Sequence, residues 1–158
     1  CLLAENLRKI GLRDGDRVVI VSENRPEWCI ADLAIMAAGC VTVPAYITNT
    51  ERDHVHILDN SGARAVIVST EKLLRPLHGA LQASGVAEHV IGIDDLHRQQ
   101  SGSFGYYNWA TMLEGDPAAA RAAVENRIAA IGRGGMPGAR PAVGEVAALP
   151  GGWWSPSA

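Results

Sequence analysis

The stretch Arg17-Val-Val-Ile-Val-Ser22 decides the fold. Four consecutive β-branched apolar residues are typical of a strand that protein covers on both faces. Similar short runs follow at residues 41–45, 65–69 and 89–93. Strands of this kind belong to a parallel sheet, because the crossover helices of such a sheet lie on both of its sides.

Helix signals separate these runs. The predicted helices cover residues 2–10, 26–38, 51–60, 71–83 and 117–131. Pro26 suits a first helical position, and Thr50 with Asp53 forms a near capping box. Because strands alternate with helices, we predict an α/β fold with a parallel sheet flanked by helices. Nearly every side chain from Trp28 to Ala38 is apolar, so we expect this helix to be buried on most sides.

Composition excludes several classes of protein. The chain has 158 residues, of which 47% are hydrophobic and 20% charged, with a net charge of -3. This charge offers no basic footprint for nucleic acid. The sequence has no transmembrane segment, because its longest apolar stretch, residues 29–43, is short and interrupted by Asp32.

We expect Cys29 and Cys40 to be buried small apolar residues in a reducing, cytoplasmic setting.

The first residue is Cys1 rather than Met, and residues 2–10 already have the pattern of a helix that ends at Gly11. We therefore expect the sequence to begin inside a longer chain.

Several motifs occur in an order and spacing that resemble the N-terminal part of long-chain acyl-CoA synthetases, which are AMP-dependent, adenylate-forming ligases. The motifs are Gly15-Asp-Arg-Val-Val-Ile-Val-Ser-Glu-Asn-Arg-Pro-Glu-Trp28, Ala31-Asp-Leu-Ala-Ile-Met-Ala-Ala-Gly39, Thr42-Val-Pro-Ala-Tyr46, Thr48-Asn-Thr50 and His56-Ile-Leu58. The resemblance weakens after Asp95 and extends to about Gly132.

The resemblance implies that residues 1–132 are the N-terminal portion of the large domain of such an enzyme. It also implies the activity of the complete enzyme, in which ATP activates a long-chain fatty acid as an acyl-adenylate and CoA then displaces AMP. Fatty acid, ATP, Mg²⁺ and CoA are the ligands implied for that enzyme. We expect this chain alone to bind none of these cofactors and to be inactive.

The chain departs from the family where a phosphate-binding loop should follow the last helix. A loop that holds phosphate needs consecutive backbone N–H groups, hydroxyl donors and usually a lysine. Residues 132–138 offer glycines but no hydroxyl, and Pro137 removes an N–H donor. No lysine follows Lys72. We interpret the glycine cluster as unrelated to phosphate binding.

A histidine pair and an aspartate pair are the next candidates for a metal-binding or catalytic site. His54 and His56 lie on nearly opposite faces of a helix, so one metal site cannot easily use both, and we interpret them as solvated. Asp94 and Asp95 lack a partner base and metal-ligand spacing, so we expect them to begin a helix.

Polar residues at the end of the first strand are stronger candidates. Ser22, Asn24 and Arg25 follow the carboxyl end of a strand, where open α/β sheets bind ligands. The alternative is that they shape the turn into the next helix and pair locally. Tyr46 is either part of a substrate channel or a packing residue, and we expect packing. No catalytic, cofactor-binding or metal-binding residue is assigned.

Three functions stay open from the sequence: an incomplete fatty acid–CoA ligase, a stand-alone α/β binding or interaction module, and a small nucleotide-binding enzyme. The missing lysine and hydroxyls count against the third.

Residues 133–158 have no strand or helix period and hold four of the eight prolines, so we expect this tail to be disordered. Two origins are open: a frameshifted translation of a GC-rich gene, and a natural disordered tail.

Translation of the same DNA in the other two forward frames distinguishes these origins. A frameshift predicts that one frame after the codon for Gly132 encodes a Ser/Thr/Gly-rich loop with a following lysine or arginine. If neither frame encodes such a loop, the frameshift interpretation is wrong.

Overall fold

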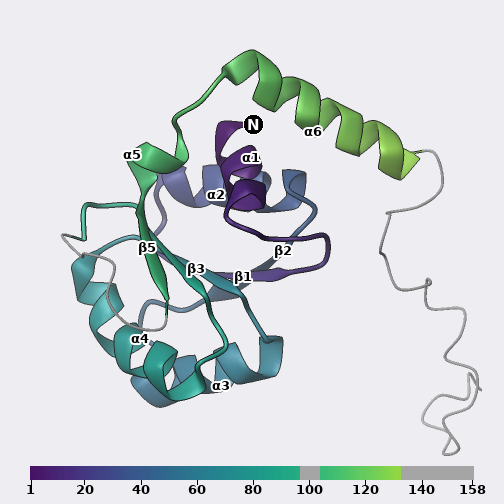
Figure 1. Cartoon of the computed structure of the whole chain (residues 1–158). Helices are drawn as coiled ribbons and strands as arrows, with labels where there is room; N and C mark the ends of the chain where they lie inside the picture. Colours follow the sequence, from purple (N-terminus) through teal and green to yellow (C-terminus); the bar gives the residue numbers. More distant parts are fainter. Residues whose placement is uncertain (97–103, 133–158) are drawn as a thin grey trace, which may run out of the picture.

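The computed structural model describes residues 1–96 and 104–132, which form a parallel five-stranded sheet with helices on both faces (Figure 1). The strands are β1 (Arg17–Val21), β2 (Val41–Ala45), β3 (Ala65–Val68), β4 (His89–Gly92) and β5 (Gly105–Asn108). The helices are α1 (Leu2–Lys9), α2 (Pro26–Ala37), α3 (Glu51–Ser61), α4 (Glu71–Ser84), α5 (Trp109–Met112) and α6 (Pro117–Gly132).

The strand order is β2-β1-β3-β4-β5, and every pairing is parallel. This confirms the predicted fold class and four predicted strands. The sequence prediction missed β5, an edge strand of four residues. Pro44 lies in β2 at the other edge, where its missing N–H costs no hydrogen bond of a central ladder.

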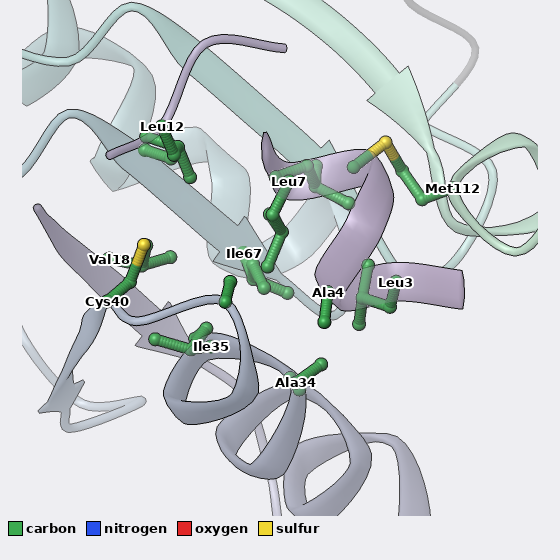
Figure 2. Packing of buried hydrophobic residues seen from close by; sticks show 14 of the residues in the cluster. Leu3, Ala4, Leu7, Leu12, Val18, Ala34, Ile35, Cys40, Ile67 and Met112 are labelled. Carbon is green, nitrogen blue, oxygen red and sulfur yellow. The ribbon is translucent and has the colours of Figure 1, made fainter. Parts of the chain in front are cut away.

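The strands bury alternate side chains in two separate cores. Val18, Ile20 and Ile67 face α1 and α2, whereas Val19 and Val66 face the layer of α3 and α4. Figure 2 shows the first core, in which residues of α1 and α2 meet the sheet and Met112 of α5. The β-branched run therefore has the two-sided cover that its composition predicts.

Helix α2 corrects one expectation. Ala31, Ala34 and Ile35 pack on the sheet, but Leu33 is 63% exposed. Cys29, which we expected to be buried, is exposed on this outer side of the helix, whereas Cys40 is buried. The apolar sequence of α2 exceeds what a single packed face can bury, so burial on most sides was wrong.

Helix α3 begins with the predicted cap. The Thr50 hydroxyl accepts a hydrogen bond from the Asp53 N–H, and the Asp53 carboxylate accepts one from the Thr50 N–H. His54, which we interpreted as solvated, is buried with 1% exposure, while His56 is exposed. The two histidines do lie on different faces, but one of those faces packs against the protein.

The amino end of the sheet is held by arginines. Arg17 donates to the carbonyls of Ser61 and Gly62 at the end of α3, over 2.6 and 2.8 Å. Arg64 contacts Asp16 at 3.0 Å and Glu88 at 2.5 Å. These contacts join segments that are far apart in sequence.

None of the helices in the described part of the chain is long and apolar enough to cross a membrane. The expected disorder of residues 133–158 lies outside the described residues.

The two faces of α2 predict opposite effects of truncation. Ile35→Ala should lower the free energy of unfolding by about 2–5 kcal/mol, because it leaves a cavity in the core. Leu33→Ala, two residues away on the exposed face, should change it by less than about 0.5 kcal/mol. Urea denaturation of the full chain measures both values, and equal losses for the two variants contradict this orientation of α2.

Burial of His54 predicts acid sensitivity. Burial lowers the pKa of His54 below its usual 6.5, and the pKa of His89 is lowered for the same reason. The unfolded chain therefore binds more protons than the folded chain once the pH falls below about 6.5. The free energy of unfolding should decrease between pH 7.5 and 5.5, by at most about 1.4 kcal/mol per pH unit for each group.

Replacement of His54 tests this prediction. His54→Leu should reduce the pH slope, and the remaining slope from histidine burial is due to His89. Urea denaturation at each pH measures the slope, and the same slope in wild type and His54→Leu contradicts the role of His54.

Candidate functional site

The carboxyl ends of β1, β3 and β4 bring together the polar residues that the sequence marks as candidates. Ser22 to Arg25 follow β1, Ser69 follows β3, and Asp94 follows β4. The parallel register places these strand ends at one edge of the sheet. This is the edge at which open α/β sheets bind ligands.

Glu23 is fixed by the neighbouring strand. Its carboxylate accepts a short hydrogen bond from the buried hydroxyl of Ser69. This hydrogen bond is the main reason that the pKa of Glu23 lies below its usual value, and a backbone N–H and the charges of Arg25 and Lys72 act in the same direction. Ser22 donates to the backbone carbonyl of Glu23 at 3.0 Å. Glu23 is therefore an anchored anion that ties β1 to β3.

Arg25 is paired on two sides. Its Nε donates to Glu27 at 2.9 Å, and its terminal nitrogen donates to Asp94 at 3.0 Å. These two hydrogen bonds raise the pKa of Arg25 above its usual value. The hydrogen bond from Arg25 to Glu27 lowers the pKa of the Glu27 carboxyl. The Arg25–Asp94 pair links the start of α2 to the end of β4, across 69 positions of sequence.

Residues 93 and 94 form a bend, and residues 95 and 96 belong to no helix or strand. A helix that Asp94 and Asp95 lead into would continue through residues 97–103, which lie outside the described residues. The Asp94 carboxylate contacts a guanidinium from a distant segment, and such a pairing has no local sequence signal.

The charges at this edge disfavour phosphate. The guanidinium of Arg25 is paired with two carboxylates, from Glu27 and Asp94, and also interacts with the charge of Glu23. A bound anion must compete with the two carboxylates already paired with Arg25 and meets net negative charge. The geometry favours the alternative in which Ser22 and Arg25 shape the turn and pair locally.

A small hollow of about 360 Å³ lies beside this turn. Its lining residues are Asn24, Arg25, Pro26, Trp28 and Cys29. Asn24 and Cys29 are exposed there. The hollow offers one indole and one thiol next to the paired guanidinium, and among the described residues that line it Arg25 is the one cation.

The other candidates lie apart from this edge cluster. His54 is a buried residue of α3, and its Nδ1 has no hydrogen-bond partner within the described residues. Tyr46, which we expected to pack, is 80% exposed, so that expectation was wrong. Gly132 ends α6, and residues 133–138 lie outside the described ranges. Within residues 1–96 and 104–132, no three His, Cys, Asp or Glu side chains gather where a metal ion could bind.

Sequence reasoning missed Glu23 and Ser69 as members of the cluster. Both stand at or next to the end of an apolar run, which is the signal that could have identified them. The rule that selected Ser22 and Arg25 applies equally to them, since the carboxyl ends of parallel strands share an edge.

Comparisons with known proteins identify the family. The sequence model of the family described as AMP-binding enzyme matches residues 1–131. Long-chain-fatty-acid–CoA ligase FadD15 of Mycobacterium tuberculosis is 39% identical over 83 residues, which are 51% of this chain and 14% of that protein. The mouse mitochondrial acyl-coenzyme A synthetase ACSM3 is 33% identical over 103 residues, 65% of this chain and 17% of that protein.

The fold has solved counterparts. A benzoate CoA ligase from Burkholderia xenovorans LB400 matches with a TM-score of 0.56 and 32% identity, over 60% of this chain and 19% of that chain. This chain thus spans less than a fifth of the length of each of these three relatives. Because the family match covers residues 1–131, the chain belongs to the AMP-binding enzyme family, whose relatives here are adenylate-forming acyl-CoA ligases.

Proposed function

We propose that residues 1–132 are the N-terminal portion of the large domain of a long-chain fatty acid–CoA ligase. The complete enzyme uses ATP to form an acyl-adenylate from the fatty acid and then transfers the acyl group to CoA. The 39% identity to a mycobacterial long-chain-fatty-acid–CoA ligase supports this substrate class. Three unpaired cysteines fit a reducing, cytoplasmic compartment.

Within that enzyme, this segment supplies structure rather than chemistry. The observation that carries this proposal is the mutual pairing of Arg25 with Glu27 and Asp94. These three charged groups already have internal partners, so the edge holds the turn after β1 in place. ATP, Mg²⁺ and CoA are ligands of the complete enzyme and need groups from beyond this segment.

Adenylation makes demands that this chain does not meet. The triphosphate must be held while negative charge develops on the departing pyrophosphate, and cations or N–H donors usually offset that charge. The sequence has only two lysines, Lys9 and Lys72. Lys9 ends α1 and Lys72 is in the first turn of α4, and no glycine-rich stretch directly precedes either lysine in the sequence.

A non-catalytic interaction module is the second candidate, because one helix exposes a large apolar face. Ile30, Leu33 and Met36 of α2 are each about half exposed or more. This candidate and the first share a property: both require a protein surface that covers α2.

The proposal predicts that the purified full chain releases no pyrophosphate from ATP and palmitate. The rate should equal that of a blank without protein, because neither a phosphate loop nor a late lysine is present. FadD15 of Mycobacterium tuberculosis is the positive control in the same assay. Pyrophosphate release by this chain that depends on palmitate and exceeds the blank contradicts the proposal.

A further inference from the structure

Helix α6 lies on the outside of the fold next to α1 and is joined to α5 by an extended connection (Figure 1). Of the side chains at residues 117–130, those of Ala120 and Val124 alone are buried. These two residues lie four positions apart, so they share the side of the helix that meets α1 and α2. Helix α4, in comparison, buries five side chains, four of them leucines. The apolar contact that holds α6 is therefore small.

A shared carboxylate adds a polar contact to α6. Asp14 lies in the turn between α1 and β1, and its Oδ1 accepts hydrogen bonds from Arg8 of α1 and Arg127 of α6, each over 2.8 Å. The three side chains are 17–27% exposed. Since they are partly withdrawn from water, their attraction is stronger than that of a fully exposed pair.

Gly39 provides the space in which this carboxylate lies. A Cβ on Gly39 would lie 2.5 Å from Oδ1 of Asp14 and 3.5 Å from Nη1 of Arg127, and the φ of Gly39 is +80°. The Gly39 carbonyl accepts a hydrogen bond from the Gly15 N–H over 2.8 Å, which ties the turn to the end of α2. The carboxylate of Asp14 therefore meets α6 from a turn that is itself held in place.

The connection before α6 contains one residue suited to a hinge. The Asn6 side chain donates to the carbonyl of Glu114 over 2.9 Å, so the chain is held to α1 as far as Glu114. Asp116 is already fixed to the helix, because its carboxylate accepts a hydrogen bond from the Ala118 N–H over 2.8 Å. Gly115 lies between these two fixed segments with a φ of +133°. Glycine has the widest choice of backbone conformations, so a rotation of α6 is least costly at this residue.

Arg8 lowers the cost of separating α6 from Asp14. A partly buried carboxylate that loses its single partner is left unpaired, which is strongly unfavourable. Asp14 keeps its hydrogen bond from Arg8 when Arg127 leaves, and Arg127 then reaches water. Separation therefore leaves no unpaired charge inside the protein.

We propose that α6 detaches from the rest of the protein as a unit, with Gly115 as its hinge and the Asp14–Arg127 pair as the contact that holds it closed. In the open state, β1 to β5 and α1 to α5 keep their structure. The inference goes beyond the proposed function and does not depend on it, because it concerns a movement of this chain alone.

Native-state amide hydrogen exchange on the full 158-residue chain tests this movement. A free helix of 16 residues is marginal in water, so the amides of α6 exchange when the helix detaches. In wild type we expect α6 to exchange faster than residues 17–21 of β1, because detachment needs less free energy than global unfolding.

The probe variant is Arg127→Gln, and its matched control is Arg121→Gln. Both changes remove one charge from α6 and introduce a good helix former, and of the two arginines it is Arg127 that contacts Asp14. Arg127→Gln should speed exchange of α6 by about three-fold or more, by the same factor at residues 119–124 and 125–130. Arg121→Gln should leave the exchange of α6 unchanged.

A second variant separates detachment from global unfolding. Val66 is buried in the core on the α3 and α4 side of the sheet, and α6 packs on the other side. Val66→Ala should speed the exchange of residues 17–21 about ten-fold, because two buried carbon atoms are lost. It should leave the exchange of α6 unchanged, because Val66 stays buried when α6 detaches.

Four results overturn the inference. In wild type, one is an α6 that exchanges no faster than β1. Another is a Val66→Ala chain in which α6 and β1 both exchange faster by the same factor, because α6 then opens only with global unfolding. The others are equal effects of Arg127→Gln and Arg121→Gln, and faster exchange confined to the residues around 127.

Discussion

Burial of β1 and β3 on both faces is the constraint on which the rest of the structure depends. Val18 to Val21 and Ala65 to Val68 are all 0% exposed. Removing each large aliphatic side chain from water contributes about 1.5–3 kcal/mol. This gain is available only if each face of the sheet has its own cover, so helices must lie on both sides.

The same constraint determines the structure at the carboxyl ends of β1, β3 and β4. The chain must turn after β1 and pack α2 back onto the sheet, and polar residues at the turn satisfy one another. Glu23 bonds to Ser69, and Arg25 joins Glu27 to Asp94. A ligand-binding edge of an α/β sheet needs unpaired donors, and this cluster has used its charged donor internally. This segment can therefore belong to an enzyme family although it carries no reacting groups of its own. The scaffold and the reacting groups can come from different parts of a longer chain.

Much of the fold could be predicted because its signals are local. The β-branched runs at 17–21 and 65–68 indicate strands, and Thr50 caps the helix that it was expected to cap. Strand β5, Gly105 to Asn108, was missed because it lacks the β-branched apolar run that marks the other strands.

Burial and pairing were harder to predict. His54 and Tyr46 were misplaced because burial depends on which face of an element meets the core. The Arg25–Asp94 pair joins residues 69 positions apart, and one sequence contains no signal for it. Helix α2 was predicted to be buried on most sides because nearly every side chain from Trp28 to Ala38 is apolar. The described chain covers only the side of α2 that holds Ala31, Ala34 and Ile35, and Leu33 on the other side is exposed.

Amide hydrogen exchange on the full chain tests most directly whether this segment forms its own covered sheet. The account predicts that peptides containing residues 17–21 and 65–68 exchange slowest, at rates set by global unfolding, and that the edge strand at 105–108 exchanges faster. Exchange of residues 17–21 and 65–68 at the rate of an unfolded chain would contradict the account, because the two-sided burial of β1 and β3 would then be absent from this chain.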